Sequence, residues 1–297
     1  MRRALATVFS LCLAAPAAAA PTVLATIKPV HSLVAAVMAG VGEPQLLIQG
    51  AQSEHSYALK PSDAQKIGGA AIIFEIGPDL ETYLARPLAT LAHGEVVALE
   101  YEQGVLKLPA RKGGLWEDDQ ADESLTDPHL WLAPGNATAM TAAIVRTLSK
   151  ADPDHAALYA ANGRREFLVL NRLENDLKAS LAPLRGRPYL VFHDAYQYFE
   201  RPFGLSSVGT VTVAPDRPVG PRRVSELRDA IRSRGIVCVF REPQFAPALV
   251  QTLVEGSRAR IGILDPLGAE LKPGPQLYPT LLKNLAASLA ECLGKNR

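Results

Sequence analysis

Three of the six histidines in this 297-residue chain follow or lie within apolar runs, where binding and catalytic residues are often found. His193 comes directly after "YLVF", His55 comes five residues after "LLIQG", and His129 lies inside "DPHLWLAP". Ligands of open α/β sheets bind outside the carboxyl ends of the strands, so a cleft between two sheets could gather all three imidazoles. A single histidine there is a catalytic base, a metal ligand or a packed core residue. Three together favour metal binding.

Three carboxylates stand at similar positions and could complete a coordination sphere. Glu54 precedes His55, Glu242 follows "CVFR", and Asp265 follows "IGIL". Three imidazoles and one carboxylate suit a tetrahedral Zn(II) site, whereas a Mn(II) site would offer more oxygen ligands. The alternative is a zinc-dependent hydrolase that uses the three-histidine site with an open coordination position and Glu242 as general base. A bound fourth carboxylate would close the site and favour carriage of the ion.

The remaining histidines offer weaker cases for metal binding. His31 opens an expected helix as a cap or surface residue, and His93 lies in "LAHGE" at a helix end. His155 lies in the first turn of a long helix, away from the strand ends. We therefore expect none of the three to bind the ion.

The elements that position these residues alternate along the chain. Short apolar runs, expected as strands, are separated by segments with helical spacing of apolar residues, which is typical of parallel sheets covered by helices. The expected strands are residues 22–27, 44–50, 70–77, 188–192, 207–213, 235–240 and 260–265. The sequence thus predicts an α/β fold of two Rossmann-like lobes with parallel sheets and a metal site in the interlobe cleft.

A long rigid helix is expected to join the two lobes. Asp152 can cap it and Pro153 suits its first turn, while the next proline is Pro183. About 30 helical residues would be ~45 Å long, which is too long for an ordinary crossover. Gly163 is the one residue that weakens this prediction. The expected organisation is an N-terminal lobe of residues 20–151, a connecting helix of residues 152–184 and a C-terminal lobe of residues 185–297.

The N-terminus has the layout of a cleavable signal peptide. Arg2 and Arg3 precede an apolar run that is too short to span a bilayer and ends in small residues, which predicts cleavage after residue 19. We therefore expect a periplasmic protein. Removal of the two arginines moves the formal net charge from +1 to −1. No basic block remains to bind phosphates, so nucleic acid is not an expected partner.

Two cysteines, Cys238 and Cys292, remain after the signal peptide is removed. An even pair in an oxidising compartment most simply forms one disulfide, with two buried thiols as the alternative. The bridge would tie the expected strand at residues 235–240 to a final helix at residues 280–294.

Five motifs resemble those of the zinc-binding solute-binding proteins of ABC transporters, the ZnuA type. In chain order they are "GAQSEHSYALKPSD", "DPHLWLAP", "VFHDAYQYFE", "FREPQF" and "LDPLG". Each motif alone is weak, but together they cover essentially the whole mature chain in the right order. The resemblance implies that His55, His129 and His193 bind one Zn(II). Cys238 and Cys292 match the disulfide positions of this family.

The fourth ligand varies among such proteins. We favour Asp265, because Glu54 and His55 are adjacent and would both have to turn toward one ion; Glu54 and water are the alternatives. Manganese-binding relatives place a carboxylate where His193 stands, so zinc is favoured over a manganese-binding transporter component.

The resemblance further implies high-affinity capture of periplasmic Zn(II) and its delivery to the membrane permease of an ABC transporter, which is driven by a separate ATPase. We expect a monomer that is not an enzyme, with a periplasmic metallochaperone as a further conceivable partner. A third interpretation is an adhesin, which would differ from the transport protein only in the partner that it binds. Many relatives carry a histidine-rich loop where this chain has acidic residues 117–123. These carboxylates either lie in a solvated surface loop without a further role or attract cations to the cleft by their electrostatic field.

Overall fold

The computed structural model of the chain describes residues 20–116, 126–212 and 218–294 and contains two parallel β-sheets. The first has the order β2-β1-β3-β4, from Val23–Ala25 (β1), Gln45–Leu46 (β2), Ile72–Glu75 (β3) and Glu95–Ala98 (β4). The second has the order β5-β6-β7, from Tyr189–Leu190 (β5), Cys238–Arg241 (β6) and Arg260–Ile263 (β7). The expected α/β fold with parallel sheets is confirmed. The predicted signal peptide and acidic residues 117–123 lie outside the described residues.

Helices cover both sheets, as the alternating sequence pattern predicts. They are α1 (Lys28–Val37), α2 (Pro61–Gly69), α3 (Ala85–Leu91), α4 (Pro134–Ala151), α5 (Ala156–Leu181), α6 (Gln197–Phe203), α7 (Pro221–Ser233), α8 (Ala248–Val254) and α9 (Leu277–Gly294). Several begin with proline in the first turn, where its missing N–H would have no helical partner. Within the described ranges, no helix combines enough length with enough apolar character to span a bilayer.

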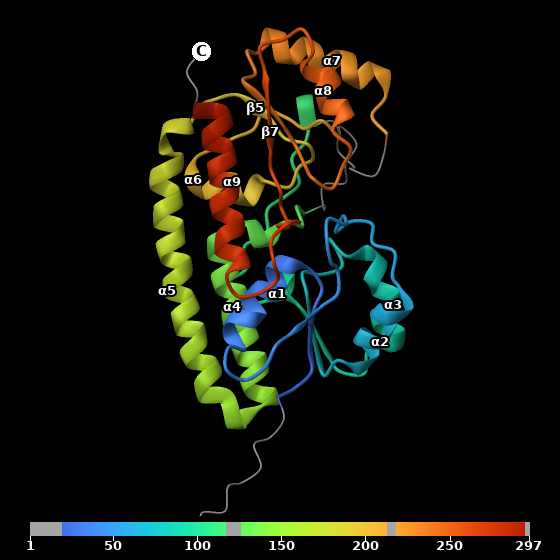
Figure 1. The fold of residues 1–297 in the computed structure, drawn as a ribbon, viewed down its shortest axis with the longest axis vertical. Helices are drawn as coiled ribbons and strands as arrows, with labels where there is room; N and C mark the ends of the chain where they lie inside the picture. The colour runs from blue at the N-terminus through green and yellow to red at the C-terminus, as the bar shows by residue number, and fades with distance from the viewer. Residues whose placement is uncertain (1–19, 117–125, 213–217, 295–297) are drawn as a thin grey trace, which may run out of the picture.

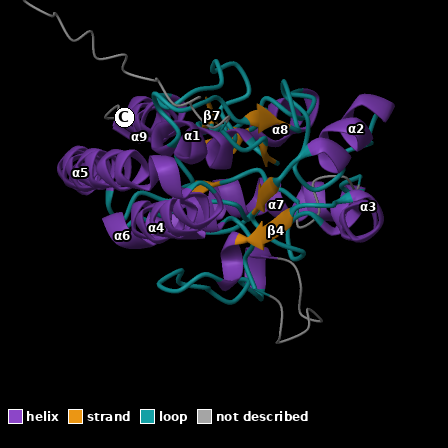
Figure 2. Cartoon of the chain, turned by 90° about the horizontal axis from the view of Figure 1, so that it is seen from below, coloured by secondary structure: helices purple, strands orange, loops and turns teal. Residues whose placement is uncertain are grey.

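The first sheet is buried on both faces. Leu24 and Ile73 pack with the apolar side chains of α2 and α3, whereas Val23 and Phe74 join the core formed with α1, α4 and α5. Successive residues of a strand point to opposite faces, so the continuous apolar runs of β1 and β3 fill two separate cores. Figure 2 shows α2 and α3 on one side of the molecule and α1, α4, α5 and α9 on the other.

The long connecting helix is present as α5, which runs along both lobes (Figure 1). Its 26 residues correspond to ~39 Å at the usual rise of an α-helix. Gly163 does not interrupt it. A Cβ there would lie 2.5 Å from Cγ2 of Val145 in α4, so this glycine allows the two helices to pack closely.

Buried hydrogen bonds tie the two lobes together beside α5. The ammonium of Lys28, in α1, donates to the carbonyl oxygens of Gly268 (3.0 Å), Ala269 (2.5 Å) and Leu271 (3.2 Å). Burial lowers the pKa of this amine, and its three donors are satisfied by three acceptors. The indole N–H of Trp131 donates to the carbonyl oxygen of Pro266 (2.8 Å). The loop after β7 is thus fixed to the first lobe.

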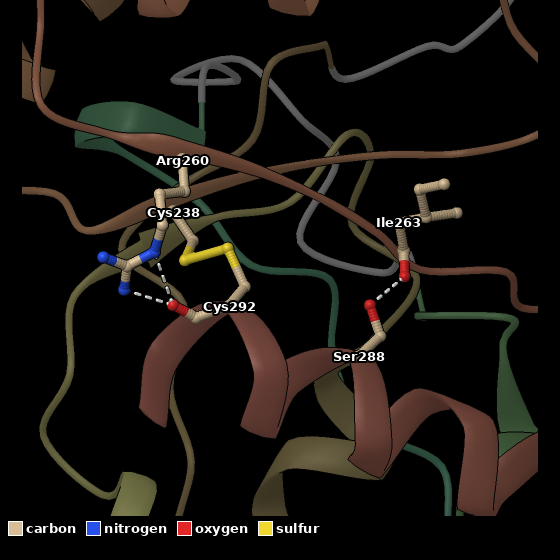
Figure 3. The surroundings of a disulfide bond; sticks show 5 residues. All are labelled: Cys238, Arg260, Ile263, Ser288 and Cys292. Atoms are coloured by element: carbon tan, nitrogen blue, oxygen red, sulfur yellow. Dashed lines mark hydrogen bonds between the residues drawn. A yellow bond between two sulfur atoms is a disulfide. The ribbon is translucent and has the colours of Figure 1, made fainter. Parts of the chain in front are cut away.

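The C-terminal helix is fastened to the second sheet (Figure 3). The predicted disulfide between Cys238 and Cys292 is present and joins β6 to α9. The side chain of Arg260, in β7, donates to the carbonyl oxygen of Cys292, and the hydroxyl of Ser288 donates to that of Ile263. Because α9 also packs on α1 and α5, it links the second sheet to the shared helical core.

One expected strand differs. The described part of the segment predicted as a strand at residues 207–213 forms a single parallel bridge, Val191–Thr210, rather than a strand, although Val208 and Val211 donate backbone hydrogen bonds to Tyr189 and Val191 (both 2.9 Å). The backbone N–H of Thr210 donates to the carbonyl oxygen of Leu115 (3.0 Å). A Cβ on Gly209 would lie 2.2 Å from Cβ of Leu115, so the absence of a side chain lets this distant segment approach. Leu115 therefore packs into the core of the second lobe.

Candidate metal centre

The three predicted histidines come together between the two sheets. His55 lies in the loop after β2, His129 immediately precedes a short 3₁₀ helix (Leu130–Leu132), and His193 lies in the bend between β5 and α6. His129 and His193 are buried, and His55 is half-buried. Two lobes thus supply the side chains of one cluster.

The ring nitrogens of these histidines are spaced like the ligands of one metal ion. Nε2 of His129 lies 3.2 Å from Nε2 of His55 and 3.1 Å from Nε2 of His193. The three ring centroids lie 5.0–5.3 Å apart. Nitrogens bound at ~2.0–2.1 Å to tetrahedral zinc would be about 3.4 Å from one another. Nε2 of His129 therefore needs to move from each of the other two nitrogens by only a few tenths of an ångström to accept the ion.

Glu54 completes a group of four candidate ligands. One oxygen of its carboxylate and one nitrogen of each histidine all lie within 4.8 Å of one another. The side chain is buried, and its Oε1 has no hydrogen-bond partner among the described residues. A buried carboxylate oxygen without a partner is costly unless an ion or proton compensates it. The adjacency of Glu54 and His55 does not prevent both from facing the cluster.

Asp265, which we favoured from the sequence as the fourth ligand, lies outside this group of four. Its Oδ1 accepts hydrogen bonds from the side chain of Gln244 (3.0 Å) and from backbone N–H groups at positions 267 and 268. Its Oδ2 accepts one from the N–H of Ala269 (2.6 Å). The carboxylate thus shapes the turn that receives Lys28. Coordination by Asp265 remains a prediction, to be weighed against Glu54.

Two further carboxylates stand behind the cluster. Oδ1 of Asp127 lies 2.8 Å from Nδ1 of His129, and Oε1 of Glu242 lies 2.8 Å from Nδ1 of His193. From the sequence, Glu242 is a candidate for the coordination sphere or for a catalytic base but not for a partner of His193, and Asp127 is not identified. The signal available for Asp127 was its position two residues before His129 in "DPH".

Burial and neighbouring charge set the protonation of the cluster. Burial, followed by the charges of neighbouring groups, lowers the pKa of His55 and of His129 well below the usual 6.5. Burial acts on His193 in the same direction, but the charge and hydrogen bond of Glu242 raise its pKa to about 9. Burial raises the pKa of Glu54 to about 7. Imidazole binds a metal in its neutral form, so ion binding at His193 releases a proton.

The other histidines have separate surroundings. A ring nitrogen of His31 lies 3.0 Å from the carbonyl oxygen of Pro44. His155 pairs with Asp152 through Nδ1 (2.8 Å), at the corner between α4 and α5. His93 is exposed in the turn after α3. None of these belongs to the cluster.

Comparisons with known proteins give the same family over nearly the whole chain. A family model described as "Zinc-uptake complex component A periplasmic" matches residues 23–292. The chain is 45% identical to the high-affinity zinc uptake system protein ZnuA of Brucella suis over 92% of each protein. It is 33% identical to the protein of that name from Yersinia pestis, over 93% of this chain and 92% of the relative. A crystal structure of a ZnuA deletion mutant plus zinc has a similar fold, with a TM-score of 0.79 at 24% identity, covering 94% of this chain and 100% of that one.

Proposed function

The chain belongs to the ZnuA family of periplasmic zinc-uptake proteins, and we propose that it captures Zn(II) in the periplasm for delivery to an ABC permease. The observation that carries this function is the convergence of three imidazole nitrogens from two lobes: Nε2 of His55 and of His193 lie 3.2 and 3.1 Å from Nε2 of His129, and all three lie within 4.8 Å of one another. Neutral imidazoles at that spacing favour Zn(II).

The proposed ligands are His55, His129 and His193, with Glu54 in the fourth position. Glu54 is supported by its place within the group of four and by its unpartnered oxygen. Asp265 is the alternative, and it would have to exchange hydrogen bonds from its own turn for the ion. Four protein ligands would enclose the ion, which suits carriage.

The family and the geometry disfavour the alternatives. A manganese carrier would be expected to have more oxygen ligands than this group offers. A zinc hydrolase needs an open coordination position and a free base. Glu242, the candidate base, accepts hydrogen bonds at Oε1 from Nδ1 of His193 and from the hydroxyl of Tyr196 (3.1 Å), so it lies behind the ring of His193 and not at Nε2, the nitrogen that faces the cluster. We therefore assign no catalytic role to the chain.

The proposed partners are a membrane permease and its separate ATPase. Export by the signal peptide would place the mature chain, as a monomer, on the periplasmic side. A periplasmic metallochaperone is a further partner compatible with this placement. An ion enclosed by residues of both lobes requires relative movement of those residues for release, and docking on the permease would supply it.

The test uses the mature chain without a histidine tag. Competition with a zinc chelator should give one zinc per chain and a submicromolar Kd, and the gene should restore growth in low zinc to a bacterium that lacks its own zinc-binding protein. His129→Ala should abolish both effects, whereas the matched control His155→Ala should preserve both. Tight binding without restored growth would reject delivery to a permease, and absence of stoichiometric zinc would reject capture.

A further inference from the structure

Two of the three clustered imidazoles are held from behind by buried carboxylates. Asp127 is 2% exposed and Glu242 is 1% exposed, and each lies 2.8 Å from Nδ1 of its histidine. Since an ionised carboxylate only accepts, Nδ1 of each ring carries the proton and donates it to the carboxylate. Nε2 of each ring then faces the centre of the cluster and is the nitrogen left to bind the ion, once His193 has released the second proton that its raised pKa implies.

Each carboxylate is itself fixed in place. Oδ1 of Asp127 also accepts the backbone N–H of His129 (3.0 Å), and Oδ2 accepts a long hydrogen bond from the side chain of Gln197 (3.4 Å). Oε1 of Glu242 also accepts the hydroxyl of Tyr196 (3.1 Å). Tyr196 and Gln197 are consecutive residues of the segment that begins with His193. This short segment thus supplies one ligand and contacts both carboxylates.

His55 is built differently. It is half-buried in a loop without helix or strand, and among the described residues no carboxylate is hydrogen-bonded to its Nδ1. Its backbone N–H donates to the hydroxyl of Ser53 (3.2 Å), and its ring contacts only the other two imidazoles of the cluster through Nε2 and the ring faces, with no carboxylate to fix its direction. The cluster therefore combines two oriented imidazoles with one adjustable imidazole.

We propose that Asp127 and Glu242 are positioning residues that hold His129 and His193 in the Nδ1–H tautomer, with Nε2 toward the ion, and thereby set the affinity for zinc. This inference rests on the proposed zinc-binding function. Carboxylates that fix the tautomer and direction of a ligating imidazole also increase its basicity, and their loss typically costs about 10–100-fold in metal affinity.

The chain offers a matched control in the pair formed by Asp152 and His155. Asp152 also accepts a hydrogen bond from Nδ1 of a histidine, at 2.8 Å, and one from the hydroxyl of Tyr159. It is buried like the two positioning residues but lies at the α4–α5 corner, outside the cluster. Asp152→Ala therefore reproduces the loss of a carboxylate–imidazole pair without touching the proposed site.

The first measurement is zinc affinity by chelator competition. We expect Asp127→Ala and Glu242→Ala each to weaken binding by about 10–100-fold, and Asp152→Ala to leave it unchanged. Asp127→Asn and Glu242→Gln preserve volume and one acceptor oxygen, so they should fold if the alanine variants do not and should weaken binding by less. Affinities within about threefold of wild type for all four variants would overturn the proposal.

The second measurement reads the tautomers directly in the zinc-free chain. Two-bond ¹H–¹⁵N correlation spectra of protein labelled at histidine should show His129 and His193 protonated at Nδ1. Asp127→Ala, or Asp127→Asn if alanine does not fold, should change the pattern of His129 and leave that of His155 unchanged. Absence of a proton on Nδ1 of His129 and of His193 in the wild type would overturn the proposal. Because this measurement needs no zinc, it separates failure of the positioning role from failure of zinc capture.

Discussion

The two sides of the metal centre differ in how they hold their ligands. His129 and His193 are buried, and each donates to a buried carboxylate. His55 and Glu54 belong to a loop after β2, where His55 is half-buried and, among the described residues, no carboxylate accepts a hydrogen bond from its ring. The imidazoles of one side are oriented by carboxylates before the ion arrives, whereas the imidazole of the other side is not.

This difference suggests a division of labour between affinity and exchange. Oriented ligands lose little conformational freedom on binding, so they contribute most of the affinity. A ligand on a loop can leave and return without disturbing the core. A carrier needs both properties, because it must bind its ion tightly and also release it to a partner.

The largest expected effect is loss of a ligand from the oriented side. His129→Ala or His193→Ala should weaken zinc binding on the order of 1,000-fold, or ~4 kcal/mol, because the change removes a ligand and leaves a buried carboxylate without its donor. His55→Ala should cost less, roughly 10–100-fold, because water can reach the half-buried position and take its place. Isothermal titration with a competing chelator measures all three.

His155→Ala is the control for this series and should leave affinity unchanged. Equal losses at positions 55, 129 and 193 would remove the distinction between the two sides. A loss in His155→Ala as large as that in His129→Ala would reject the ligand assignment itself.

A smaller effect on affinity is expected from removing the disulfide. The bridge closes 54 residues, so its loss should lower the free energy of unfolding by ~4 kcal/mol on the chain-entropy account. Cys238 precedes Glu242 by four residues in and just after β6, a distance of about 13 Å along an extended chain. Urea unfolding of the variant with Cys238→Ala and Cys292→Ala should show the loss, with zinc affinity within about threefold of wild type. A large loss of zinc affinity in the same variant would show that the orientation of His129 and His193 depends on the distant disulfide.

The smallest expected effect is on overall shape. α5 is continuous across both lobes, and the buried contacts of Lys28 and Trp131 join them at a second place. Helices kink sharply mainly at proline or similar defects, and α5 has no internal proline. Small-angle scattering of zinc-free and zinc-loaded protein should therefore give nearly the same radius of gyration, with hydrogen-exchange differences in the His55 loop. A change of several ångströms in the radius of gyration would reveal a wide hinge. It would show that zinc binding moves the lobes rather than the His55 loop.

Features that depend on local pattern could be predicted from the sequence. Apolar runs alternating with helical segments indicated parallel sheets, because strands buried on both faces need continuous apolar residues. His55, His129 and His193 were identified from their places after or within such runs, and the structure brings them together. The two cysteines that remain after the signal peptide indicated the disulfide, because an even number of cysteines in an exported chain usually pairs.

Features that depend on distant partners could not be predicted. The segment expected as a strand at residues 207–213 does run beside β5, but its contact with Leu115, about 95 positions earlier, could not be read from the sequence. Asp265 stands after a strand and accepts hydrogen bonds from backbone N–H groups of the turn that follows, and its coordination of the ion stays a prediction. The role of Asp127 depends on the direction of the His129 ring, which spacing alone does not define.

The most direct test of the central claim is zinc K-edge X-ray absorption on the mature, untagged chain loaded with one equivalent of Zn(II). The account expects four-coordinate zinc with three imidazole ligands at ~2.0–2.1 Å and one carboxylate oxygen. The imidazole contribution should fall to two rings in His55→Ala protein that is still loaded with zinc. A sulfur shell, a six-oxygen shell, or an imidazole count unaffected by that substitution would contradict capture of zinc by His55, His129 and His193.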